Sequence, residues 1–244
     1  MNDIVIALND LKSAFFQTNE KFWPFLKKHW PEIVGFTIGC LFLEQFFRVL
    51  ALQAQAVGHV NYGAEIGKAL SALMLLVIFS IQIPLRSMQD DGEHEPMSFW
   101  AFSQKHAKAY ALEGLVAMGL MCIGVLFFVL PAIVIQVAVT FFPFVIFCDP
   151  RYYNSDLNAL KESHRLMKGL LLLGTIAALI SLAAQMWIMQ TTEKLLIHET
   201  PILWGFYAIG VIFGSVYICL LLYRLYRVRI VSLGEMESTP SKEQ

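Results

Sequence analysis

The sequence predicts an all-α, polytopic membrane protein with six transmembrane helices. Of its 244 residues, 57% are hydrophobic and only 15% are charged, whereas soluble domains carry about 25% charged residues. The uncharged residues are concentrated in long runs, and a helix needs roughly 20 apolar residues to cross a bilayer. No stretch alternates apolar and polar residues for long enough to form a membrane barrel. We therefore expect one membrane domain over residues 1–233, followed by a disordered cytoplasmic tail over residues 234–244.

The apolar runs define the six expected spans. They are predicted at about residues 31–53, 67–86, 110–130, 131–148, 169–191 and 201–223. The third and fourth spans share the uncharged tract Gly114–Cys148, which as one straight helix would be about 52 Å long. That length is too great for a single crossing. Because Pro131 lacks a backbone donor and clashes with the preceding turn, we expect a hairpin at Leu130-Pro131.

The distribution of basic residues supports this hairpin. With six spans, 15 of the 18 Lys and Arg residues lie on one face of the membrane. The other face receives Lys68 and Lys194, and Arg48 lies within the first span. A single crossing would divide the basic segments between the faces, against the positive-inside rule. We therefore expect both termini in the cytoplasm, and the acidic start MNDIVIALND predicts no cleaved signal peptide.

Three segments on the basic side are predicted to be interfacial helices. In residues 3–19, Ile4, Leu8, Leu11 and Phe15 recur at helical spacing on one face. The second segment, at about residues 98–110, contains a pattern that also precedes the first span. The third, at about residues 154–168, has three basic residues on one face.

The shared pattern is FWxFxxKH, found in Phe22–His29 and again in Phe99–His106. Aromatic rings favour the headgroup level of a membrane, and lysines sit beside phosphates. We expect the three segments to contact anionic lipid headgroups, or alternatively an acidic partner protein. The residues predicted for this face are Trp23, Lys28, Trp100, Lys105, Lys161, Arg165 and Lys168.

Polar side chains at membrane depth form a second candidate site. Glu44 and Arg48 are four residues apart in the first span and can pair on one helix face. Charges at this depth are costly and mark functional sites, although a purely structural pair is an alternative. The complete set of expected intramembrane polar residues is Glu44, Gln45, Arg48, Gln82, Gln136 and Gln185.

No catalytic, cofactor or metal motif is found. The sequence contains no HExxH, GxSxG, P-loop, GxGxxG or CxxC pattern, and its four cysteines lie in or beside apolar runs. The acidic stretch Gln89–Pro96 lacks the spacing of a known metal site. We therefore expect a protein that is not an enzyme, with no cofactor, no metal and no nucleic-acid partner.

Part of the sequence resembles a known family. The motifs are Val129–Ile133, Phe142–Val145 and Ala159–Gly169, the last reading ALKESHRLMKG. Over roughly residues 110–190 they resemble YciC-like bacterial inner-membrane proteins, and the membrane domain of some glycerophosphodiester phosphodiesterases. The family has Gly where this chain has Ala132. The resemblance implies a six-helix protein of the bacterial inner membrane and implies no catalytic residues.

Two functions are compatible with these features. The first is an accessory or scaffold component of a membrane complex or of envelope organisation. The alternative is a transporter or lipid-handling protein with a polar path lined by Glu44, Arg48, Gln136 and Gln185.

Overall fold

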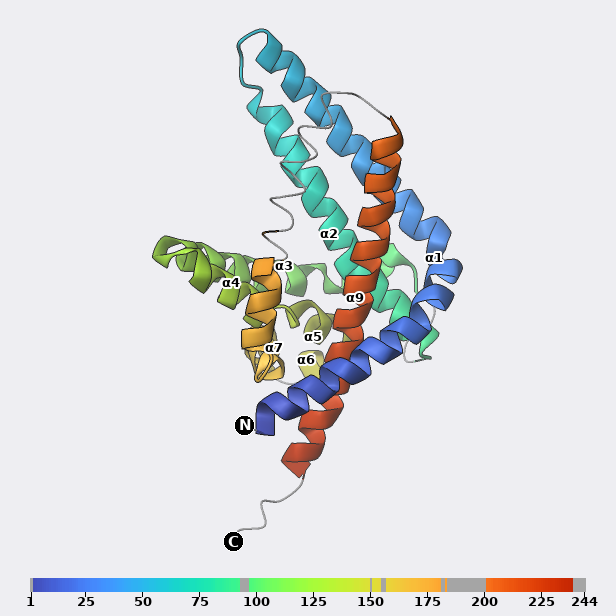
Figure 1. Cartoon of the computed structure of the whole chain (residues 1–244), viewed down its shortest axis with the longest axis vertical. Helices are drawn as coiled ribbons and strands as arrows, with labels where there is room; N and C mark the ends of the chain where they lie inside the picture. Colours follow the sequence, from blue (N-terminus) through green and yellow to red (C-terminus); the bar gives the residue numbers. More distant parts are fainter. Residues whose placement is uncertain are drawn as a thin grey trace.

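The protein is α-helical throughout the part of the chain that the structure describes. This computed structural model describes residues 2–92, 97–149, 151–154, 157–180, 183 and 201–238, which form helices and turns and include no strand (Figure 1). The predicted all-α class is therefore confirmed. Long helices run along the length of the molecule, and shorter helices gather around their lower half (Figure 1).

Helix α1 (Asn2–Ala56) joins two segments that we expected to be separate. The predicted interfacial helix and the first predicted span form one continuous helix of 55 residues, with Pro24 and Pro31 inside it. A proline inside a helix removes a backbone hydrogen bond and produces a kink. Figure 1 shows α1 changing direction between its N-terminal and C-terminal halves. The two halves therefore point along different directions without a loop between them.

Helices α1 and α2 (Tyr62–Asp90) form a long antiparallel hairpin (Figure 1). The connection includes Gly58 at φ +76°, and the Asn61 side chain accepts a hydrogen bond from the Ala64 amide at 3.1 Å, which caps α2. A Cβ atom on Gly67 would lie 2.5 Å from the Phe47 ring. The absence of a side chain at Gly67 therefore allows the two helices to approach closely.

Helix α9 (Pro201–Ser238) packs against both members of this hairpin. The three helices share an apolar cluster consisting of Phe22, Phe25, Leu26, Ile33, Phe79, Ile83, Ile212, Val216 and Leu220. Helix α9 continues to Ser238, into the segment 234–244 that was predicted to form a tail. Residues 239–244 lie outside the described part of the chain.

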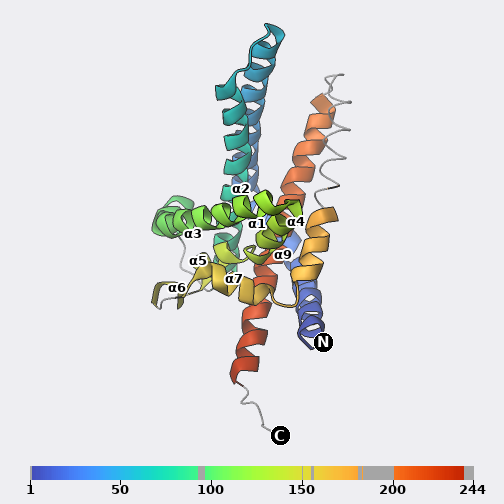
Figure 2. The ribbon, with the colours of Figure 1, turned by 90° about the vertical axis from the view of Figure 1, so that its left-hand side faces the viewer.

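The uncharged tract turns back on itself, but earlier than expected. Helix α3 (Phe99–Phe127) ends and α4 (Val129–Ala138) begins on either side of Phe128, whose φ is 130°. Pro131 lies in the first turn of α4, where its missing N–H costs no helical hydrogen bond. A Cβ on Gly124 would lie 2.8 Å from Ala132 Cα, so the two helices are in close contact. Figure 2 shows this α3–α4 hairpin running across the direction of α1, α2 and α9.

The rest of the fourth predicted span forms part of the protein core. After a turn at residues 139–141, α5 (Phe142–Cys148) buries residues 143–147 completely or nearly so. It packs with α7 (Ala159–Met167) and with the lower part of α9 in the largest apolar cluster, while α6 (Arg151–Asn154) follows it. The Ser163 hydroxyl accepts from the Phe141 amide at 2.9 Å and donates to the Ala138 carbonyl at 2.9 Å. It thus supplies hydrogen bonds where the helix is interrupted.

Several helices have the length and composition of membrane spans. Within the described residues these are Asp3–Ala56, Phe99–Phe127 and Val129–Cys148, and a fourth candidate is the pair Ala159–Met167 and Leu171–Ile180, which is bent by 91°. The predicted fifth span, 169–191, is described only to residue 180 and at residue 183. The chain therefore contains long apolar helices of a membrane protein.

Candidate functional site

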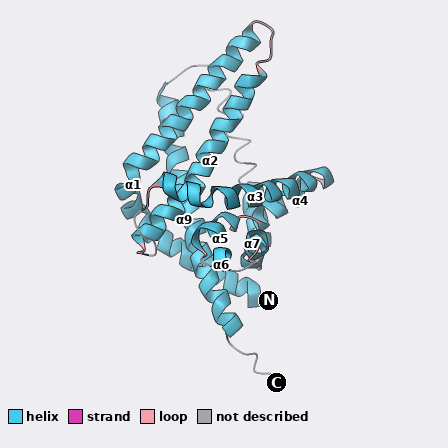
Figure 3. Ribbon diagram, turned by 180° about the vertical axis from the view of Figure 1, so that it is seen from behind, coloured by secondary structure: helices cyan, strands magenta, loops and turns pink. Residues whose placement is uncertain are grey.

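The lower half of the molecule contains a set of ion pairs, which we call the base. It consists of residues 2–32 of α1, residues 82–92, α5, α6, α7 and residues 223–238 of α9. Viewed from behind, these elements lie together around the lower part of α9 (Figure 3). Several ion pairs of the base join segments that are far apart in the sequence.

The most buried of these pairs links the two ends of the chain. Arg229 is 2% exposed, and its guanidinium lies 2.9 Å from the Asp10 carboxylate. It also donates to the backbone carbonyls of Leu166 and Lys168, at 2.9 and 2.6 Å. The Ser232 hydroxyl donates to the same Asp10 oxygen at 2.9 Å. Arg229 therefore connects α1, α9 and the end of α7 through charge-assisted hydrogen bonds.

Two further pairs fix the end of α2 to its neighbours. Arg224 on α9 binds Asp91, with its closest nitrogen 2.7 Å from the carboxylate. Glu32 on α1 accepts two bonds from Arg86, at 2.7 and 2.9 Å. Glu32 also accepts a bond from the fully buried Gln82 at 3.1 Å.

The first FWxFxxKH copy places its histidine inside the base. Phe22, Phe25 and His29 lie on one face of α1 and are each at most 8% exposed. The His29 ring is 4.8 Å from the Phe25 ring, and its Nε2 lies 3.0 Å from Asp90. Lys28 donates to the other oxygen of Asp90. Burial acts to raise the pKa of Asp90, but the hydrogen bonds and charges of Lys28 and His29 outweigh it and lower the pKa.

The second copy has the same arrangement at the start of α3. Phe102 and His106 are buried, with their rings 4.5 Å apart. His106 Nδ1 lies 2.6 Å from the hydroxyl of Tyr153, which belongs to α6. Burial, with a smaller contribution from Tyr152, raises the pKa of Tyr153 to about 12, so this hydroxyl is neutral at physiological pH.

The two copies therefore share a pattern of burial as well as of sequence. In each, phenylalanine and histidine at steps of four face the protein, and tryptophan lies on the outside. Trp23 is 55% exposed and Trp100 is 70% exposed. The outward tryptophans agree with the predicted interfacial face, whereas the histidines of the same motif are buried in the protein.

The third predicted basic segment is mostly used within the protein. On α7, Arg165 pairs with the buried Glu162 at 2.7 Å, and Arg151 lies 3.3 Å from the same carboxylate. Lys168 pairs with Asp3 at 3.2 Å. Lys161 is exposed, as is Lys105 on α3, and neither has an ion pair within the described residues. Two of the three cations predicted to bind headgroups or a partner are thus engaged inside the base.

The polar residues at membrane depth are not gathered at one place. Glu44, Gln45 and Arg48 are half-buried on α1, whereas Gln136 is exposed on α4. Gln82 binds Glu32, and Glu44 lies twelve residues from Glu32, or about 18 Å along a helix. The predicted Gln185 lies outside the described residues.

Several residues that organise the base were not predicted from the sequence. They are Asp10, Glu32 and Ser163, and isolated polar residues of this kind give no indication of their partners in the sequence. The inward histidines could have been found, since Phe22, Phe25 and His29 follow the i, i+3, i+7 spacing of one helix face. No group of three or more His, Cys, Asp or Glu side chains within the described residues is arranged to hold a metal ion.

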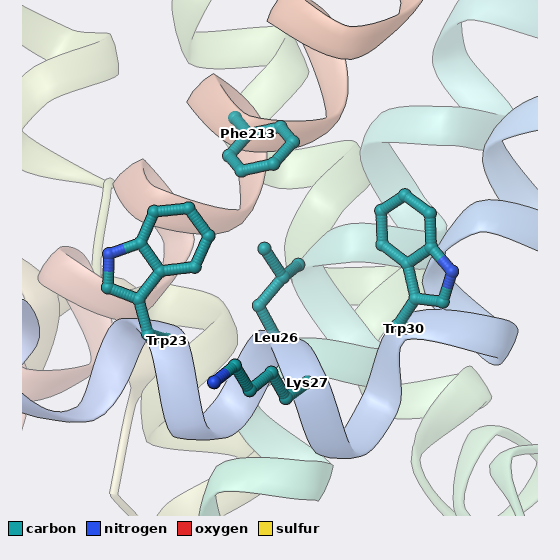
Figure 4. A pocket seen from close by; sticks show the side chains of 5 residues that line it. All are labelled: Trp23, Leu26, Lys27, Trp30 and Phe213. Atoms are coloured by element: carbon teal, nitrogen blue, oxygen red, sulfur yellow. The ribbon is translucent and has the colours of Figure 1, made fainter.

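An open apolar groove lies at the upper edge of the base. Figure 4 shows the indole rings of Trp23 and Trp30 standing apart on α1, with Leu26 between them and Phe213 of α9 above. The groove has a volume of about 350 Å³, and Lys27 runs along its edge (Figure 4).

A comparison of the chain with protein-family models, curated proteins and solved structures finds no match.

Proposed function

We propose that this protein is a non-enzymatic scaffold of a bacterial inner membrane, which crosses the bilayer six times with both termini in the cytoplasm. In this proposal the base lies at the cytoplasmic surface of the membrane and holds the transmembrane helices in a fixed arrangement. The apolar helices contact lipid or the helices of a partner protein. The proposal includes the YciC-like resemblance of residues 110–190, which rests on the sequence motifs alone.

The observation that carries the proposal is the orientation of the N-terminal part of α1. This amphipathic segment contacts the rest of the base through the small, fully buried Ala7 and Ala14 and the partly buried Leu11. The other large apolar side chains of the predicted face point outward, with Ile4 49%, Leu8 45% and Phe15 46% exposed. An exposed apolar stripe on a helix fixed to the membrane-proximal part of a protein is suited to the bilayer interface. The base thus holds an interfacial helix with its apolar face free.

The arrangement favours a scaffold over a transporter. A transport path requires polar residues that face one cavity, whereas Glu44, Gln82 and Gln136 lie on three helices and have different surroundings. The organised polar contacts are in the base, where they connect helices to each other. Such contacts hold a structure and do not by themselves perform chemistry.

Affinity purification from gently solubilised native membranes tests the scaffold proposal. A membrane-protein partner should be recovered in stoichiometric amount, and the variants Leu8→Ser and Phe15→Ser should retain it while reducing association of the N-terminal segment with lipid. Recovery of the chain alone under these conditions would contradict the proposal.

Topology reporters test the six-span arrangement separately. Reporters fused after Met88 and after Tyr153 should lie on the same, cytoplasmic side of the membrane. If they lie on opposite sides, the uncharged tract crosses the bilayer once and the proposed topology is wrong.

A further inference from the structure

We propose that the groove between Trp23, Trp30 and Phe213 binds one anionic phospholipid, with an acyl chain between the indole rings and the phosphate at Lys27. This inference rests on the membrane location proposed above and adds a specific ligand to it. The groove is a different surface from the exposed stripe of Ile4, Leu8 and Phe15.

The shape of the groove suits a hydrocarbon chain. Trp23 and Trp30 are seven residues apart, so they lie on the same face of α1 about 10.5 Å apart along its axis. Leu26, which is 3% exposed, forms the floor between them, and Phe213 closes the upper side (Figure 4). The volume of about 350 Å³ is within the range of ligand pockets, about 300–1,000 Å³.

The ring contacts hold one wall of the groove in place. The Trp23 ring makes edge-to-face contacts with Phe22 at 5.4 Å and with Phe213 at 5.8 Å. Phe22 is itself 8% exposed and packs on Tyr217. These contacts fix the orientation of Trp23 although it is 55% exposed. A preformed wall lowers the ordering cost of binding.

The charge at the groove selects the headgroup. Lys27 and Lys28 are adjacent, but Lys28 is bound to Asp90 inside the base. Lys27 is exposed, has no ion pair within the described residues, and extends along the groove with its ammonium group towards Trp23 (Figure 4). An unneutralised cation beside an apolar groove matches a ligand with an anionic head and a hydrocarbon tail.

The position of the groove gives the ligand a route from the bilayer. Above it, α1 continues into a surface on which Ile38 is 59% and Phe42 is 71% exposed. On the same stretch of α1 as the groove, Lys28, His29 and Glu32 form ion pairs with residues of α2. Tryptophan is enriched at this kind of boundary between apolar and polar regions. A lipid bound in the groove would therefore stay within its leaflet of the bilayer.

Native mass spectrometry of the full chain in nonionic detergent tests the proposal. The protein is titrated with dioleoyl phosphatidylglycerol and, separately, with dioleoyl phosphatidylcholine, which has the same chains but no net charge. We expect tighter binding of the first lipid, and Lys27→Gln should weaken that binding about fivefold and weaken phosphatidylcholine binding less, because the choline cation offsets the charge of its phosphate. Trp30→Ala should weaken the binding of both lipids, because it removes a wall of the groove.

Lys12→Gln is the matched control, since Lys12 is another exposed lysine of α1 that has no ion pair in the described part of the chain. It should retain the lipid preference of the unchanged protein. Equal binding of the two lipids, or an equal loss in the Lys12 and Lys27 variants, would overturn the proposal, since either result indicates diffuse attraction without a groove site. Flotation with liposomes tests the membrane location separately from the groove site. A chain that floats with liposomes but does not prefer the anionic lipid is a membrane protein without the groove site.

Discussion

The base and the α3–α4 hairpin differ in what surrounds their side chains. In the base, buried carboxylates meet arginines, as Asp10 of α1 meets Arg229 of α9 and Glu162 meets Arg165 one turn further along α7. On the hairpin, the large apolar side chains around the turn are mostly exposed, with Leu126 at 84% and Phe128 at 83%. The geometry of the base is therefore determined by the protein itself, whereas the hairpin depends on the medium around it. Substitutions should have unequal effects in the two regions.

Breaking the Arg229–Asp10 pair should have the largest effect. Arg229→Met leaves Asp10 buried without its charge partner, and removal of one member of a buried pair costs about 3–5 kcal/mol of unfolding free energy. Denaturation in detergent micelles, followed by circular dichroism, measures this loss. The double variant Asp10→Asn with Arg229→Met should recover part of it, and a loss below about 1 kcal/mol would show that the base does not depend on this pair.

Adding a side chain at Gly67, where α1 and α2 approach closely, should have the next largest effect on the free energy of unfolding. Gly67→Ala places a Cβ 2.5 Å from the Phe47 ring, and overpacking of this kind costs about 1–3 kcal/mol of unfolding free energy. Gly39→Ala is the control, because a Cβ there meets no atom within 4 Å; it should be neutral or stabilising. Phe47→Ala should rescue Gly67→Ala, and equal effects at the two glycines would contradict the close packing.

Removing Asp90 should have a smaller effect that depends on pH. Asp90→Asn loses the contacts with Lys28 and His29, which as partly exposed pairs are worth up to about 1 kcal/mol. Because folding lowers the pKa of Asp90, its contribution is complete above the unfolded pKa of about 3.9 and disappears as the pH falls through the lower folded value.

Between about pH 5 and about pH 3, the difference in unfolding free energy between wild type and Asp90→Asn should thus shrink as the pH falls. Chemical denaturation at a series of pH values in this range measures it. A difference that grows as the pH falls over this range would have the opposite sign and would exclude the proposed role of Asp90.

Truncation at the tip of the α3–α4 hairpin should have the smallest effect on stability. Leu126→Ala in detergent should change the unfolding free energy by no more than about 0.5 kcal/mol, because the side chain is 84% exposed. Ile133→Val on the same hairpin is the comparison: Ile133 is 8% exposed, and the loss of one buried methyl group costs about 0.5–1.5 kcal/mol. A larger loss at Leu126 than at Ile133 would show that the tip is packed against protein.

The properties that depend on local sequence could be predicted. The long apolar runs and the helical spacing of Ile4, Leu8 and Phe15 are local patterns, and they led to the all-α class and to the outward stripe on α1. The break in the Gly114–Cys148 tract was also expected, because a proline breaks or kinks a helix. The turn falls at Phe128, two to three residues before the predicted Leu130-Pro131, since Pro131 is tolerated in the first turn of α4.

The sequence by itself determined the helices, their apolar faces and the concentration of basic residues in certain segments. Tertiary structure alone decided which of those basic residues have ion-pair partners: Lys28, Lys168, Arg224 and Arg229 find carboxylates on other segments of the base, whereas Lys27 and Lys161 have no ion pair within the described residues. The physical reason is that helical periodicity places a charge on a face but contains no information about the opposite charge. That charge lies on another helix, which for Arg229 is 219 residues away in the sequence.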